Sequence, residues 1–178
     1  PFLVLATQNP IENEGTYKLP EAQVDRFALK ILITYPTKEQ EIEIIKRNTI
    51  NTKIQVNPIL QSKELLEMQK FNAEIYADDV ILKYVASIVD ATRNPSNYNL
   101  DLDNIIEFGA SPRASIWIIR AAKANAMVNG RGYVIPEDIK EIAHEVLRHR
   151  LILTFEAEAD EINTDKVIDI ILEKISSP

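Results

Sequence analysis

The hydrophobic pattern divides the chain into a short apolar beginning and a long helical remainder. Residues 1–7 form an unbroken apolar run that ends at Gln8-Asn9-Pro10. Unbroken hydrophobicity is typical of a strand covered on both faces, as in a parallel sheet. Residues 28–34 are the second strand candidate. Because two short strands do not make a stable sheet alone, we expect the other strands to lie upstream of Pro1.

From Tyr35 onward the pattern is almost entirely helical. Thr37 and Gln40 have the spacing of a capping box, and Pro20 suits the first turn of a short helix between the two strand candidates. A short strand at 151–155 is expected to pair with 54–56, and the acidic run at 156–161 is read as a solvated loop. Further helices are predicted at about 37–46, 62–69, 78–93, 111–128, 136–147 and 164–175.

Composition narrows the class of protein. The 178 residues are 46% hydrophobic and 26% charged, which is the balance of a folded soluble chain, and the net charge is −7. An acidic chain argues against a nucleic-acid groove or an anionic membrane surface as the main partner. There is no cysteine and no apolar run long enough for an integral membrane segment, so we expect a cytoplasmic protein. Since the chain starts at Pro1 without Met, we expect a preceding part, which would carry any targeting signal.

Asn9 follows the carboxyl end of the first predicted strand. Ligands collect at those ends in open α/β sheets, so its side chain could orient a water or contact a phosphate. An ordinary Asn-Pro turn explains Asn9 and Pro10 equally well, and on these residues alone it is the preferred interpretation.

Arg26 lies among acidic residues on the short helix after Leu19. It could project from a subunit edge toward the nucleotide of a neighbour and stabilise charge on the transferred phosphoryl group. The alternative is a solvated arginine paired with Asp25 or Glu21, and the residues alone favour that alternative.

Arg113 is predicted in the first turn of the helix that Ser111 and Pro112 open. A cation is mildly unfavourable there, and a broken local rule points to function. An arginine beside a helix amino terminus suits phosphate binding. An exposed arginine tolerated at small cost explains the position equally well.

The remaining candidates favour structural roles. His144 and His149 have no partner at metal-ligand or catalytic-triad spacing, so no metal site is predicted. Arg148-His149-Arg150 reads as a polar helix end. No glycine is followed by lysine, so the chain has no GxxxxGK[ST] phosphate loop, and no apolar run ends in paired magnesium-binding acids.

Several runs together resemble the MoxR-type AAA+ ATPases, relatives of the magnesium-chelatase ATPase subunits. They are 6–12, 14–17, 19–27, Gly109–Ala114, 130–138 and 146–150, and they occur in the family's order. Lys18 stands where the family often has proline. The resemblance implies a mainly α fold, in which 1–37 ends a P-loop α/β core and 38–178 forms the helical lid.

The resemblance also implies roles and partners. Asn9 would be sensor 1, Arg26 the arginine finger acting in a neighbouring subunit, and Arg113 sensor 2. The whole protein would be a homo-oligomer, a hexameric ring that uses ATP and Mg²⁺ for chaperone-like work, often with von Willebrand factor A domain proteins. The phosphate loop would lie upstream of Pro1, so this chain alone is expected to be inactive.

Two other functions fit some of the sequence. A helical protein-interaction module would carry the same arginines on its surface, and a nucleic-acid motor is possible because related ring ATPases handle DNA. The acidic charge argues against the motor.

Overall fold

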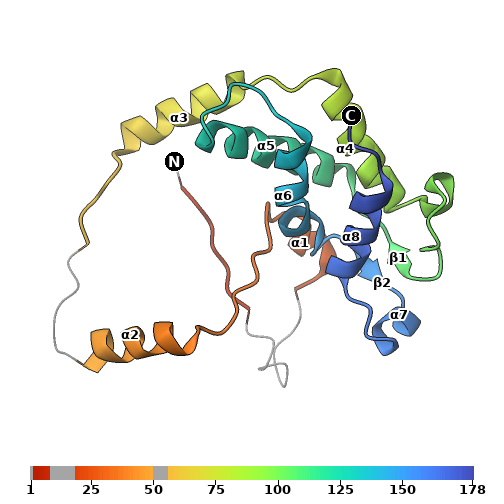
Figure 1. Cartoon of the computed structure of the whole chain (residues 1–178), viewed down its shortest axis with the longest axis horizontal. Coiled ribbons are helices and arrows are strands. Elements are labelled where there is room, and N and C mark those ends of the chain that lie inside the picture. The colour runs from red at the N-terminus through yellow and green to blue at the C-terminus, as the bar shows by residue number, and fades with distance from the viewer. Residues whose placement is uncertain (1, 9–18, 50–55) are drawn as a thin grey trace.

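The computed structural model describes residues 2–8, 19–49 and 56–178, and in these ranges the chain is mainly helical (Figure 1). A helical bundle of α4, α5, α6 and α8 forms the body of the molecule, while α2 lies apart from it. The elements in chain order are α1 (Glu21–Val24), α2 (Lys38–Thr49), α3 (Ser62–Glu74), α4 (Asp79–Ala91), the 3-10 helix η1 (Pro95–Tyr98), β1 (Ile106–Phe108), α5 (Pro112–Val128), α6 (Pro136–Leu147), β2 (Ile152–Leu153), α7 (Phe155–Ala159) and α8 (Thr164–Lys174).

The helices begin where the sequence predicts them, because their capping groups satisfy the first free N–H groups. The predicted capping box of α2 is present: Thr37 N donates to Gln40 Oε1 at 2.9 Å, and Gln40 N donates to Thr37 Oγ1 at 3.3 Å. Asp78 caps α4 by accepting from Val80 N at 2.9 Å. Both α5 and α6 carry proline in the first turn.

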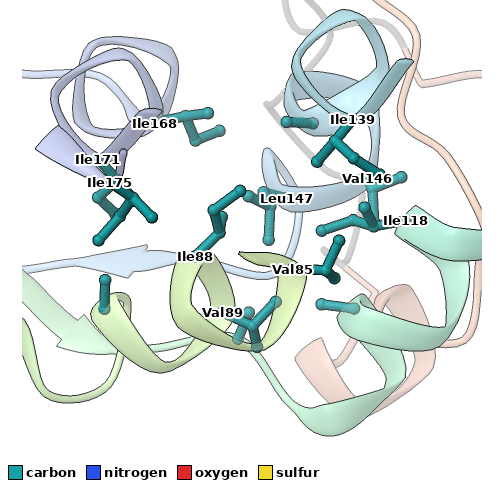
Figure 2. Close-up of a cluster of buried hydrophobic side chains, with 14 of the residues drawn as sticks. Val85, Ile88, Val89, Ile118, Ile139, Val146, Leu147, Ile168, Ile171 and Ile175 are labelled. Atoms are coloured by element: carbon teal, nitrogen blue, oxygen red, sulfur yellow. The ribbon is translucent and has the colours of Figure 1, made fainter. Parts of the chain in front are cut away.

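The core lies where four helices meet (Figure 2). Figure 2 shows side chains from α4, α5, α6 and α8 that point toward one another. Ala114, Ala122 and Ala126 lie along one face of α5 and are fully buried, so their small side chains let α5 approach α6 closely. The largest side chains with almost no exposure are Ile88, Leu102, Ile118, Ile139, Leu147, Ile168 and Ile171.

A small sheet closes one end of the bundle. β1 and β2 pair antiparallel, with Ile106 opposite Leu153 and Phe108 opposite Ile152, and with an irregularity between the two pairs. The strand at 151–155 was therefore predicted, but β1 was not. Most of the predicted partner, 54–56, lies outside the described residues. The acidic run read as a loop begins instead with α7, which Thr154 caps by accepting from Ala157 N at 3.2 Å.

The mainly helical fold class is confirmed. The described residues of the two predicted core strands, 2–7 and 28–34, have no regular secondary structure in this chain. Their apolar side chains are largely exposed, with Leu3 at 80% and Ile33 at 91%. An isolated strand has no neighbour to satisfy its backbone groups, so the physical reason is the lack of paired strands.

Within the described residues, none of the helices is long and apolar enough to cross a membrane.

Candidate functional site

Asp25, just after α1, connects three groups from distant parts of the chain. Its carboxylate accepts from Ser111 Oγ at 3.2 and 3.1 Å, and forms ion pairs with Arg113 and Arg150. Ser111 and Arg113 lie at the amino end of α5, whereas Arg150 follows α6. The site therefore joins the segment after α1 to two helices of the bundle.

Arg150 is the most deeply buried charge of the site, since its side chain is 0% exposed. Its Nε donates to Asp25 Oδ1 at 3.1 Å. Both Nη atoms donate to backbone carbonyls: Nη2 to Asp25 at 3.1 Å and to Phe27 at 2.5 Å, and Nη1 to Ala28 at 3.2 Å and to Val146. Burial lowers the pKa of Arg150, although Asp25 opposes this effect. The guanidinium thus uses all five of its N–H groups, as a buried arginine must.

The two residues before Arg150 hold the same segment. His149 Nε2 lies 3.0 Å from the carbonyl oxygen of Phe27, so this nitrogen carries the proton and donates. Burial lowers the pKa of His149 to about 4. Arg148 donates from Nη1 to the carbonyl of Lys30 at 2.8 Å and from Nε to Asp165 at 2.7 Å. The chain from 25 to 30 is therefore fastened to the end of α6.

The loop before α5 sets the direction of Arg113. The hydroxyl of buried Thr92 accepts from Ala110 N at 2.9 Å. A Cβ at Gly109 would lie 2.3 Å from the carbonyl oxygen of Thr92, so only glycine fits there. Ser111 then caps α5 by accepting from Arg113 N at 3.3 Å. The Arg113 side chain is 46% exposed, so it contacts Asp25 and solvent together.

Arg26 is exposed while its chain neighbours Asp25 and Phe27 are partly buried. Its backbone is fixed on both sides, but its side chain points to the surface. Of the three predicted site residues, Asn9 lies outside the described residues. The structure places Arg113 against Asp25, in the segment that carries Arg26. The predicted pairing of Arg26 with Asp25 is not found, because Asp25 binds Arg113 and Arg150 instead.

Sequence reasoning missed the role of 148–150. The run reads as a polar helix end, yet all three side chains bind the segment after α1. The available signal was Leu147 and Leu151 on either side of the run. Apolar neighbours indicate that a polar run lies against the protein instead of facing solvent.

Two further features of the described residues bear on function. The described residues contain no group of three or more His, Cys, Asp or Glu side chains able to hold a metal ion. An open groove of about 1220 Å³ runs between α3 and α5, with largely apolar lining that includes Leu82, Ile116, Trp117 and Val128.

Two family descriptions match the chain. Residues 101–171 match the AAA lid domain, and residues 1–29 match the ATPase family associated with various cellular activities (AAA). The second match includes the segment that carries Arg26, and the first includes Arg113 and 148–150.

Whole-chain comparisons agree with these matches. The chain is 49% identical to the chaperone MoxR1 of Mycobacterium tuberculosis and 37% identical to YeaC of Bacillus subtilis, with 100% of this chain aligned in both. A crystal structure of a candidate ATPase from Cytophaga hutchinsonii superposes on all of it with a TM-score of 0.94 and 48% identity. The chain spans about half the length of these proteins: 47% of MoxR1, 53% of YeaC and 55% of the Cytophaga chain.

Proposed function

Because this chain belongs to the MoxR-type AAA+ ATPases, we propose that it supplies the sensing residues and the helical lid of a ring-forming ATP hydrolase. The observation that best supports this function is the cluster of contacts around the Asp25 carboxylate. The Asp25 carboxylate forms an ion pair with Arg113, and the next residue in the chain, Arg26, has an exposed side chain that can reach a neighbouring subunit.

Each of the three residues has its own role in this mechanism. Asn9 is sensor 1 and orients the attacking water. Arg26 is the arginine finger and stabilises charge on the phosphoryl group bound by the neighbouring subunit. Arg113 is sensor 2: its half-exposed guanidinium at the amino end of α5 is attractive to phosphate.

The chain divides into two functional parts. Residues 1–37 belong to the end of the ATPase core, and 38–178 form the lid that follows nucleotide state. The lid part is supported by the continuous core that joins α4, α5, α6 and α8. Movement of this lid would transmit hydrolysis to a client protein, as chaperone-like remodelling requires.

ATP is the substrate and Mg²⁺ the expected cofactor. The described residues do not fit a magnesium site, because they hold no suitable cluster of acidic side chains. The metal ligands and main phosphate contacts therefore belong to a phosphate loop and paired acids outside these residues, and the 178-residue chain alone should not turn over ATP.

The working assembly is a homo-oligomeric ring, six-fold in the simplest case, because an arginine finger acts across a subunit boundary. Proteins with von Willebrand factor A domains are candidate partners. The acidic net charge of −7 favours protein clients over nucleic acid. The cytoplasm is the expected location.

The test is steady-state ATP hydrolysis by the full-length protein at concentrations where it assembles. Arg26→Ala should lower kcat about a hundredfold or more while nucleotide binding is retained. The matched control is Arg47→Ala, which removes an exposed arginine on α2, a helix that lies apart from the bundle (Figure 1), and should leave turnover unchanged. An unchanged rate in Arg26→Ala would refute the ring mechanism.

A second candidate, a helical protein-interaction module, is favoured by the apolar groove between α3 and α5. It predicts that alanine at Asn9, Arg26 or Arg113 leaves ATP turnover unaltered. It also predicts that Trp117→Ser abolishes partner binding without affecting ATPase activity.

A further inference from the structure

We propose that Arg150 is a positioning residue for Arg26: from just beyond the end of α6 it holds the backbone carbonyls on both sides of the finger. This inference rests on the proposed role of Arg26 in ATP hydrolysis. The side chain of Arg150 itself is fully buried.

The contacts of a single nitrogen carry the argument. Nη2 of Arg150 donates to the carbonyl of Asp25 at 3.1 Å and to the carbonyl of Phe27 at 2.5 Å. These are the residues immediately before and after Arg26. The carbonyl groups of the residues before and after Arg26 are thus held by one rigid, planar guanidinium, which restrains the backbone from which Arg26 projects.

Further hydrogen bonds hold the segment 27–30 against α6 and the residues that follow it. His149 donates to the carbonyl of Phe27 at 3.0 Å, and Arg148 donates to that of Lys30 at 2.8 Å. In the reverse direction, Lys30 N donates to the carbonyl of Glu145 at 2.8 Å. Since residues 27–30 have no regular secondary structure to hold them, these contacts with α6 and with 148–150 hold their backbone in place.

Asp25 adds a link to the candidate sensor. Its carboxylate pairs with Arg150 through Nε and with Arg113 on the other side. A phosphate that attracts Arg113 competes with Asp25 for the same guanidinium, and Arg150 keeps Asp25 in place when Arg113 leaves. The segment carrying Arg26 therefore stays attached to the lid in both situations.

The test compares Arg150→Lys with Arg26→Ala in the full-length protein. Lysine keeps the charge but offers three donors in place of five, so at least two acceptors lose their partner. A displaced catalytic group costs up to about a hundredfold in rate. We expect kcat to fall by about ten- to a hundredfold, with KM for ATP and assembly close to wild type.

The double variant separates positioning from general damage. If Arg150 acts through Arg26, Arg26→Ala with Arg150→Lys has the same kcat as Arg26→Ala alone. The matched control is Arg131→Lys, since Arg131 is another lid arginine paired with a buried aspartate, Asp138, but does not contact 25–30. Its kcat should stay near wild type.

His149→Phe provides a milder variant in case Arg150→Lys does not fold. It removes only the donor to Phe27, because Nδ1 of His149 has no hydrogen-bond partner. It should lower kcat in the same direction, and His149→Gln, which restores a donor, should recover part of the loss.

The outcomes are distinct. Wild-type kcat in folded, assembled Arg150→Lys or His149→Phe, or additive losses in the double variant, would overturn the positioning role while leaving the proposed function intact. An unaffected kcat in Arg26→Ala would instead remove the proposed function itself.

Discussion

Nε of Arg150 lies 3.1 Å from Oδ1 of Asp25 and joins two residues that are 125 positions apart in the chain. The arginine side chain is fully buried and the aspartate side chain is 20% exposed. Ser111, Arg113, Arg148 and His149 also bind the segment after α1, but Arg150 makes the most contacts with it. This pair therefore has a large influence on whether that segment stays in place.

The first prediction concerns Asp25. Asp25→Asn keeps the shape but removes the negative charge that faces buried Arg150 and half-exposed Arg113. Removing one partner of a buried ion pair leaves an uncompensated charge, so we expect a loss of about 3 kcal/mol in the free energy of unfolding. Urea denaturation at pH 7 measures it.

Asp169→Asn is the control for that substitution. Asp169 is 61% exposed and pairs with His144, so its change should cost less than about 1 kcal/mol. Equal losses in the two variants would mean that the pair of Asp25 and Arg150 is no more important than a surface contact.

The second prediction concerns pH. Burial lowers the pKa of His149 from 6.5 to about 4, so the folded protein keeps this side chain neutral where the unfolded chain takes up a proton. The stabilisation is complete above pH 6.5 and is lost as the pH falls toward 4. At most it amounts to roughly 3 kcal/mol.

The measurement is urea denaturation of wild type and His149→Phe at pH 7 and pH 5. At pH 7 the variant should be less stable by about 1 kcal/mol, because it lacks the bond to Phe27. At pH 5 the variant should match or exceed wild type in stability, because only wild type is destabilised as its unfolded chain takes up a proton. A constant difference at both pH values would show that His149 does not titrate at a lowered pKa.

Local sequence rules predicted most of the helices, but they did not predict which strands pair in the sheet. The capping box at Thr37 and Gln40 and the cap at Asp78 are properties of neighbouring residues, so the sequence contains them in full. The pairing of β1 with β2 joins residues 106–108 to 152–153, and such distant partners leave little trace in a short run.

The same distinction holds for the candidate site. Arg113 stood out because a cation in a first helical turn breaks a local rule. Leu147 and Leu151 indicate only that the run with Arg150 lies against the protein. They do not identify what Arg150 binds, because its acceptors are the backbone carbonyls of a segment more than a hundred residues away. Roles that depend on backbone acceptors cannot be read from residue types, since every residue offers a carbonyl.

The third prediction compares two glycines. A Cβ at Gly109 would lie 2.3 Å from the backbone oxygen of Thr92, whereas a Cβ at Gly132 would meet nothing within 4 Å. Gly109→Ala must displace the backbone before α5 and should cost about 3 kcal/mol or more. Gly132→Ala should be nearly neutral. Thermal unfolding of the two variants measures the contrast, and similar midpoints would contradict the close approach at Thr92.

The fourth prediction concerns Asp138, which is 1% exposed in the first turn of α6. It accepts from Arg131 Nη1 at 2.7 Å, from Ile135 N at 2.9 Å and from Asn125 Nδ2 at 3.0 Å. Burial raises the pKa of Asp138, but the bonds from Arg131 and Ile135 outweigh it, so the pKa lies below 3.8. The charged form is therefore the stabilising one.

Asp138→Asn should lower the free energy of unfolding by about 3 kcal/mol at pH 7, because Arg131 loses its charged partner inside the lid. A lowered carboxyl pKa contributes stability above 3.8 that is lost as the pH falls through the folded-state value. The difference between wild type and variant should thus be constant from pH 7 to pH 5 and shrink below about pH 4. Urea denaturation across this range tests both parts. A difference that widens between pH 7 and pH 5 would mean that burial dominates and that the carboxyl pKa is raised, which would reverse the assignment of the charged form.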